Sequence, residues 1–150
     1  APLAHAMAAV EYLAVGQAER AGANCPVAVP TYQKLATIFA DTPEGASASA
    51  ALAAPVDVTG TLTGYPTDPA PTLYLSRQIS GSTIFSDDYR ATLGAAGAFT
   101  FSGVAVGSYN LSAALPDGSG VHWYDAQTGN PYTIVVGPLC TLALPMYTWG

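Results

Sequence analysis

From residue 56 onward, apolar residues recur at every second position in short runs that glycine and proline separate. Two of these runs are residues 98–104 (AFTFSGV) and 107–115 (GSYNLSAAL). A period of two places successive side chains on opposite faces of a β-strand, so each run predicts a strand with one buried face. The same pattern marks six further segments: residues 56–64, 71–77, 88–94, 120–126, 132–137 and 140–146. Seven or eight short strands joined by turn residues are typical of a β-sandwich.

The first 55 residues follow a different period, with apolar side chains three or four positions apart, which predicts two helices. The apolar faces consist of Leu3, Met7, Val10 and Leu13 on the first helix, and Tyr32, Leu35, Ile38 and Phe39 on the second. Thr31 is the expected N-cap of the second helix, because a threonine hydroxyl can accept a hydrogen bond from a free backbone N–H.

Residues 44–55 (EGASASAALAAP) have low sequence complexity and form either a linker or a short alanine-rich helix. The sequence therefore predicts a mainly β chain in two parts. A helical assembly segment with an Ala/Ser-rich linker covers residues 1–55, and a β-sandwich domain covers residues 56–150.

The chain is poor in charge. Charged residues make up 9% of it, against about 25% in an average soluble domain. Four lysines and arginines stand against ten acidic residues, for a net charge of -6, so we expect neither nucleic acid nor an anionic membrane surface as a partner. A surface with so little charge repels its neighbours weakly, which favours self-association.

No apolar run reaches the roughly 18 residues that span a bilayer.

The two cysteines, Cys25 and Cys140, are far apart in the sequence, and neither lies in a CxxC motif or beside a pair of histidines. A disulfide between them is expected if the protein is exported, and two buried free thiols are the alternative. The chain begins Ala1-Pro2-Leu3, which suggests a removed leader and an extracellular or cell-surface location. The alternative is that the given chain is only the ordered part of the protein.

The segment TLGAAGAFTFSGVAVGSYNLSAALPDG (residues 92–118) combines a glycine turn, a Phe-x-Phe strand, a Gly-Val turn and a Gly-x-Tyr-x-Leu strand. The residues of this pattern are Gly97, Phe99, Phe101, Gly103, Val104, Gly107, Tyr109 and Leu111. The segment resembles carboxypeptidase regulatory-like domains and the related collagen-adhesin B-type repeats, over about residues 56–146. The resemblance implies an antiparallel, prealbumin- or Ig-like sandwich of seven to eight strands. The aromatic residues of the pattern would fill its core and the glycines its tight turns, so we interpret the segment as scaffold.

The sequence departs from these groups in two ways. The adhesin repeats often carry an intramolecular Lys–Asn bond that needs a lysine in an early strand, whereas residues 56–64 have none and Lys34 lies outside the domain. The prealbumin-like hydrolases need several histidines, and this chain has only His5 and His122. We therefore expect neither the covalent bond nor an enzyme activity, and no catalytic, cofactor-binding or metal-binding residues.

Trp123 and Tyr124 are the candidate ligand-binding residues. If they lie on a strand they point to opposite faces, so that one could stack on a sugar ring while the other fills the core. The alternative is core packing beside an exposed edge.

The apolar helix faces give the leading hypothesis on function. A sandwich of this size needs no helix to bury its core, so these faces must be covered by the sheet or by other copies of the chain. We expect an extracellular structural subunit that self-assembles into a pilus-like filament or fibre, with the helices between copies and the sandwich outward. The alternative is a monomeric binding module for carbohydrate or adhesion, which would use Trp123, Tyr124, Tyr147 or Trp149.

Overall fold

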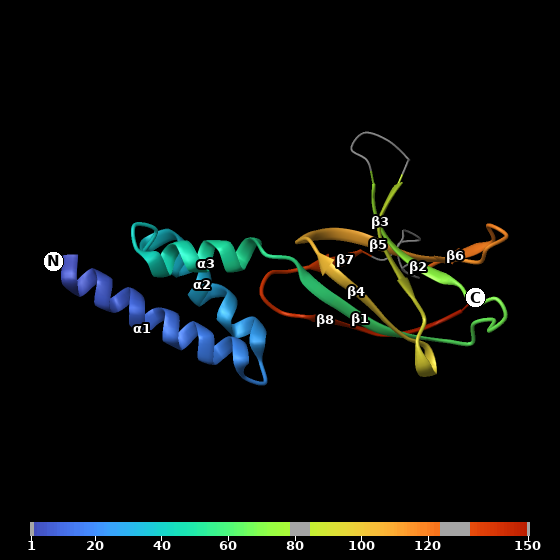
Figure 1. Cartoon of the computed structure of the whole chain (residues 1–150), viewed down its shortest axis with the longest axis horizontal. Helices are drawn as coiled ribbons and strands as arrows, with labels where there is room; N and C mark the ends of the chain where they lie inside the picture. Colours follow the sequence, from blue (N-terminus) through green and yellow to red (C-terminus); the bar gives the residue numbers. More distant parts are fainter. Residues whose placement is uncertain (1, 79–84, 124–132, 150) are drawn as a thin grey trace. The chain divides into compact units, whose positions relative to one another are not determined.

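The computed structural model describes residues 2–78, 85–123 and 133–149. The chain divides into two compact units (Figure 1). The helical unit comprises Ala1–Val56 and Gly137–Cys140, and the β unit comprises Asp57–Val136 and Thr141–Gly150. Helices and strands contribute about equally to the structure, so the expectation of a mainly β chain was wrong. Part of the reason is that the segment after residue 43 is a helix rather than a linker.

The helical unit contains α1 (Pro2–Ala21), a 3₁₀ turn η1 (Cys25–Val27), α2 (Ala28–Ile38) and α3 (Pro43–Ala53). Thr31 is not an N-cap, because α2 begins three residues before it and the Thr31 hydroxyl instead donates to Glu19 Oε1 at 2.6 Å. Pro30 lies in the first turn of α2. The backbone N–H groups of a first turn have no hydrogen-bond partner within the helix, so proline, which lacks an N–H, is tolerated there.

Thr42 provides the cap that α3 needs, since its hydroxyl accepts a hydrogen bond from the Gly45 N–H at 3.0 Å. Gly45 lies so close to the end of α2 that a Cβ at this position would collide with the Phe39 backbone. Small residues therefore let α3 approach α2. The core of the helical unit is formed by Ala9, Ala28, Tyr32, Leu35, Phe39, Ala48 and Leu139.

In the described residues, a strand is found in each of the eight segments that alternation predicted. The strands are β1 (Val56–Thr63), β2 (Thr72–Gln78), β3 (Phe85–Thr92), β4 (Ala98–Val104), β5 (Gly107–Ala114), β6 (Gly120–His122), β7 (Ile134–Val136) and β8 (Leu142–Thr148). They form one sheet in the order β4-β1-β8 and a second in the order β3-β2-β5-β6, with β7 also paired to β5. Two sheets of this kind are consistent with a β-sandwich.

The pairing of β1 with β8 is parallel, with Val58 opposite Leu142, so the expectation of an antiparallel sandwich was wrong for this pair. The strands β2, β5, β6 and β7 pair antiparallel with their neighbours in the second sheet. A bulge interrupts the parallel pair, since Leu144 and Pro145 lie against the single residue Gly60. Bulges of this kind redirect the side chains that follow them.

The aromatic alternation of residues 98–115 lies inside the β unit, as the sequence predicted. Phe99 and Phe101 on β4 are buried, and so are Tyr109 and Leu111 on β5. The two phenylalanine rings meet edge to face, with their centroids 5.8 Å apart. These four buried side chains agree with the interpretation of this segment as scaffold.

Candidate functional site

Helix α1 has two apolar faces. The inner face, with Ala9, Tyr12 and Gly16, points toward α2 and the core of the helical unit. On the opposite side, Leu3 is 72% exposed, and Met7 and Val10 are each 57% exposed. Residues three and four positions apart continue along this side to the C-terminal end of α1, so that all of these residues lie on one face of the helix. We call this exposed row the outer stripe; it consists of Leu3, Met7, Val10, Ala14, Gln17 and Ala21.

Contacts along the inner face fix the orientation of α1. Near its N-terminus, His5 Nε2 lies 2.8 Å from Asp41 Oδ1, and the imidazole stacks on Phe39 with ring centroids 4.7 Å apart. The hydrogen bond with His5 also lowers the pKa of Asp41 below its ordinary value. Farther along, Lys34 Nζ donates to the Tyr12 hydroxyl at 2.8 Å. These contacts hold the inner face against the rest of the helical unit, so the outer stripe faces away from that core.

Three of the eight residues predicted for assembly lie inside the helical unit instead. Tyr32, Leu35 and Phe39 are buried in its core, so they are not on the surface that another copy could reach. Leu13 is partly buried and packs against the same core. The structure corrects the sequence interpretation for α2, because the apolar face of this helix is covered by α1 and α3 of its own chain. Ile38, at the edge of this apolar face, is exposed.

The outer stripe carries no charged side chain. Glu11 and Arg20 are exposed on α1, but 100° of rotation per residue places them on opposite flanks of the stripe. Glu19 belongs to the inner side, where it accepts the hydrogen bond from Thr31. The stripe is therefore an uncharged surface along the whole length of α1.

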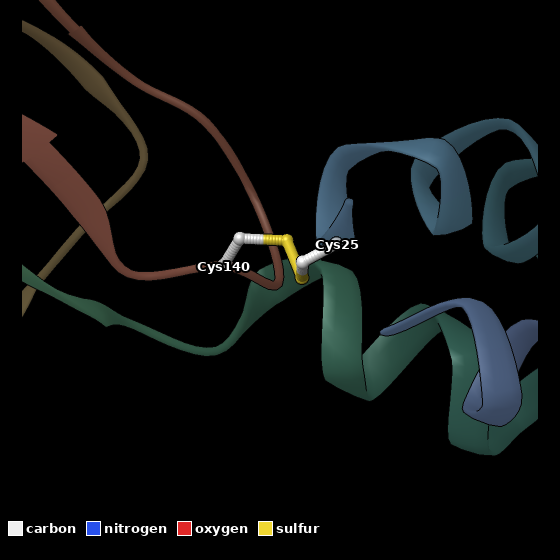
Figure 2. Close-up of a disulfide and its surroundings, with 2 residues drawn as sticks. All are labelled: Cys25 and Cys140. Carbon is white, nitrogen blue, oxygen red and sulfur yellow. A yellow bond between two sulfur atoms is a disulfide. The ribbon is translucent and has the colours of Figure 1, made fainter. Parts of the chain in front are cut away.

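The predicted disulfide is confirmed. Figure 2 shows Cys25 of η1 bonded to Cys140. The Cα atoms of the two residues are 6.1 Å apart. Both cysteines of the chain are used in this bond. The bond attaches the segment Gly137–Cys140, which runs between β7 and β8, to the helices and holds Leu139 in their core.

A second exposed feature lies in the β unit, at the end of β6 and along β8. A cavity of about 400 Å³ is lined by Trp123, Pro145, Met146, Tyr147 and Thr148. The Trp123 and Tyr147 rings lie 5.3 Å apart between centroids, tilted by 58°. The indole Nε1–H donates to the Thr148 carbonyl oxygen at 3.0 Å, which fixes the indole and leaves ring surface for an apolar contact.

Of the two predicted stacking residues, the structure therefore brings Trp123 to the cavity, while Tyr124 lies outside the described residues. The sequence also offered Tyr147 but did not pair it with Trp123, because Trp123 follows β6 and Tyr147 lies on β8, 24 positions further along the chain. The lining includes Pro145, which lies in the β8 bulge, and Met146, which follows it. Trp149 is not part of the lining.

Within the described ranges there is no cluster of three or more histidine, cysteine, aspartate or glutamate residues that could hold a metal ion. The same part of the chain contains no helix with the length and apolarity needed to cross a membrane. No family model matches the chain, and comparisons with curated proteins and with solved structures gave no match. A function must therefore be inferred from the outer stripe and the aromatic cavity themselves.

Proposed function

We propose that this chain is an extracellular structural subunit that assembles with copies of itself into a pilus-like filament or fibre. The helical unit provides the contacts between copies, and the β-sandwich lies on the outside. The observation that carries the proposal is the outer stripe, because a helix already packed on one face exposes three large apolar side chains on the other. Exposed apolar area is unfavourable by about 25 cal/mol for each Å², so contact with another copy stabilises it.

Two further features support this proposal. The low charge of the chain lets many copies crowd together with little electrostatic repulsion. The Cys25–Cys140 disulfide suits an oxidising location outside the cell, where such bonds persist. The resemblance of residues 56–146 to collagen-adhesin B-type repeats fits that proposed location.

The experiment is negative-stain electron microscopy combined with light scattering, on the unmodified chain and on a Met7→Lys variant. Met7 is exposed, so the substitution leaves the folded subunit intact and places a charge between Leu3 and Val10, the other large apolar residues of the stripe. The matched control is Ser49→Lys on α3, which adds the same charge at an exposed position of the same unit. Both substitutions reduce the net negative charge, so a loss of assembly in Met7→Lys alone cannot come from overall repulsion.

We expect regular fibres from the unmodified chain and from Ser49→Lys, and monomers from Met7→Lys. An unmodified chain that stays monomeric at high concentration would exclude the filament. Fibres from Met7→Lys that match the unmodified ones would remove the outer stripe from the assembly contact.

The second candidate function is a monomeric binding module for carbohydrate, and the aromatic cavity favours it. Its volume is within the range of ligand sites, and aromatic rings such as Trp123 and Tyr147 bind the apolar faces of sugar rings. Calorimetric titration with a panel of oligosaccharides tests it. Binding that disappears in Trp123→Ala and persists in Trp149→Ala, the control outside the lining, would support this function; absence of binding to the whole panel would reject it.

A further inference from the structure

The segment Gly137–Cys140, which we call the strap, belongs to the helical unit although the chain on either side of it belongs to the β unit. Leu139 in the strap is 5% exposed and lies in the core of the helical unit. The other large side chains buried in this core are those of Tyr32, Leu35 and Phe39. The helices therefore do not complete their core by themselves, and one of its large residues comes from a segment far along the sequence.

The backbone of the strap is strained at Leu139. The φ angle of this residue is 73°, in the left-handed region where the Cβ of a leucine comes too close to the following carbonyl oxygen. Across this residue, the Cys140 N–H donates to the Pro138 carbonyl oxygen at 2.9 Å. A hydrogen bond that spans three residues with a positive φ at the centre defines the rarer, strained form of the γ-turn. Such a conformation persists only where the surrounding structure holds it in place.

The Cys25–Cys140 disulfide is well placed to hold the strap in this conformation. Cys140 directly follows Leu139, and the bond joins the strap to η1, the turn that precedes α2. The buried side chain of Leu139 adds a second attachment to the helices. Burial of one leucine is favourable, but it has to offset both the strained turn and the ordering of four backbone residues. Without the covalent bond, this balance favours release of the strap.

The disulfide is also accessible to a reductant, since Cys25 and Cys140 are each partly exposed. A dithiol can reduce it in two exchange steps. One thiolate of the dithiol attacks a sulfur of the bond, which forms a mixed disulfide and releases one cysteine. The second thiol then displaces the other cysteine. The dithiol loses two electrons and becomes a disulfide, and its two protons end on the two cysteine thiols.

We propose that the strap is a redox-sensitive switch of the helical unit. Oxidation of Cys25 and Cys140 closes this unit by holding Leu139 in its core. Reduction by a dithiol lets the γ-turn relax and Leu139 leave, which opens the core while the β unit stays folded. The helical unit is then complete only in oxidising surroundings, where disulfides persist. This inference goes beyond the proposed filament, because it concerns the single subunit and holds with or without assembly.

Hydrogen exchange measured by mass spectrometry tests the switch on the full chain without denaturant. The oxidised chain is compared with the same chain reduced by dithiothreitol, a dithiol. Amides of α2 report on the helical core, and amides of β2 report on the β unit. We expect reduction to accelerate exchange in α2 by about tenfold or more and to change exchange in β2 by less than about twofold. Removal of the dithiol and reoxidation should restore slow exchange in α2.

A pair of variants separates the role of Leu139 from that of a simple cross-link. Leu139→Ala keeps the disulfide and removes the side chain that the strap places in the core. Its α2 should exchange rapidly even when oxidised, and reduction should accelerate that exchange by less than about threefold, because the two changes act on the same contact. The matched control is Leu52→Ala, which removes another leucine that packs against this core. The control should keep the full effect of reduction.

Three results would overturn the inference. Equal exchange in α2 of the oxidised and reduced chains would mean that Leu139 stays in the core without the bond. An effect of reduction in Leu139→Ala as large as in the unmodified chain would mean that the bond acts only as a cross-link. Equal acceleration of β2 and α2 would reject a switch confined to the helical unit.

The first and third results need no variant, so the inference stays falsifiable if Leu139→Ala does not fold. Neither result bears on the filament, which microscopy of the oxidised chain tests separately.

Discussion

Removal of the Cys25–Cys140 disulfide should destabilise the chain, and the loss should appear first in the helical unit. The bond joins residues 115 positions apart, and in the chain-entropy model closing a loop of that length stabilises the folded state by about 5 kcal/mol. The helical unit depends on the bond more than the β unit does, because Cys140 holds Leu139 in a core of few large side chains. We therefore expect the double variant Cys25→Ser, Cys140→Ser to unfold its helices at a lower urea concentration than its strands.

The chain offers separate signals for its two units. Both tryptophans, Trp123 and Trp149, belong to the β unit, so their fluorescence reports on that unit. Far-UV circular dichroism is dominated by helix and reports mainly on α1, α2 and α3. In the double variant the dichroism midpoint should fall well below the fluorescence midpoint.

Reduction of the unmodified chain is the control, and it should reproduce the transitions of the double variant. The reasoning would be refuted by two coincident transitions at the midpoint of the unmodified chain. A loss under about 1 kcal/mol would also refute it, since this is far below what the loop length predicts.

Three further predictions concern the folded subunit. Gly45→Ala should destabilise the chain by about 1–3 kcal/mol in urea titrations, because the added methyl group collides with the Phe39 backbone; an unchanged midpoint would mean that α3 packs less closely than described. Leu35→Ala should lower the free energy of unfolding by about 2–5 kcal/mol, whereas Met7→Ala on the outer stripe should change that of the monomer by less than about 0.5 kcal/mol; equal losses would contradict the assignment of Leu35 to the core. Burial raises the pKa of Tyr109 from 10.0 to about 12, so its contribution to stability should be complete below pH 10 and be lost as the pH rises toward 12. An ultraviolet titration should show a late phenolate signal that Tyr109→Phe removes.

The strands were the more predictable half of the molecule, because their signal is local. Alternation placed Phe99, Phe101 and Tyr109 on buried faces without knowledge of any partner strand. The parallel pairing of β1 with β8 was not predictable in this way. Strand alternation describes which face is buried but not which edge pairs with which, and these two strands are separated by most of the domain.

The candidate sites needed the fold for a similar reason. Trp123 was identified from its aromatic character and its neighbour Tyr124, whereas its partner in the structure is Tyr147 of β8. In the helical unit, the sequence showed that α2 has an apolar face but could not show what covers it. Leu35 and its neighbours on that face turned out to be covered within the chain.

The sequence identifies the large apolar residues of α1, and the structure shows which side of the helix is packed inside the helical unit. The sequence predicts that Leu3, Met7 and Val10 belong to a face covered by the sheet or by other copies, and burying each such residue is worth about 1.5–3 kcal/mol. Inside the helical unit, α1 packs through its other side, with Ala9 and Gly16, where small residues allow a close approach to α2 and Tyr32. A chain that folds and functions alone would gain stability from the opposite choice, with its large apolar residues inside. The exposed position of the large residues is therefore unfavourable in the monomer, and the proposed assembly would remove this cost by covering them.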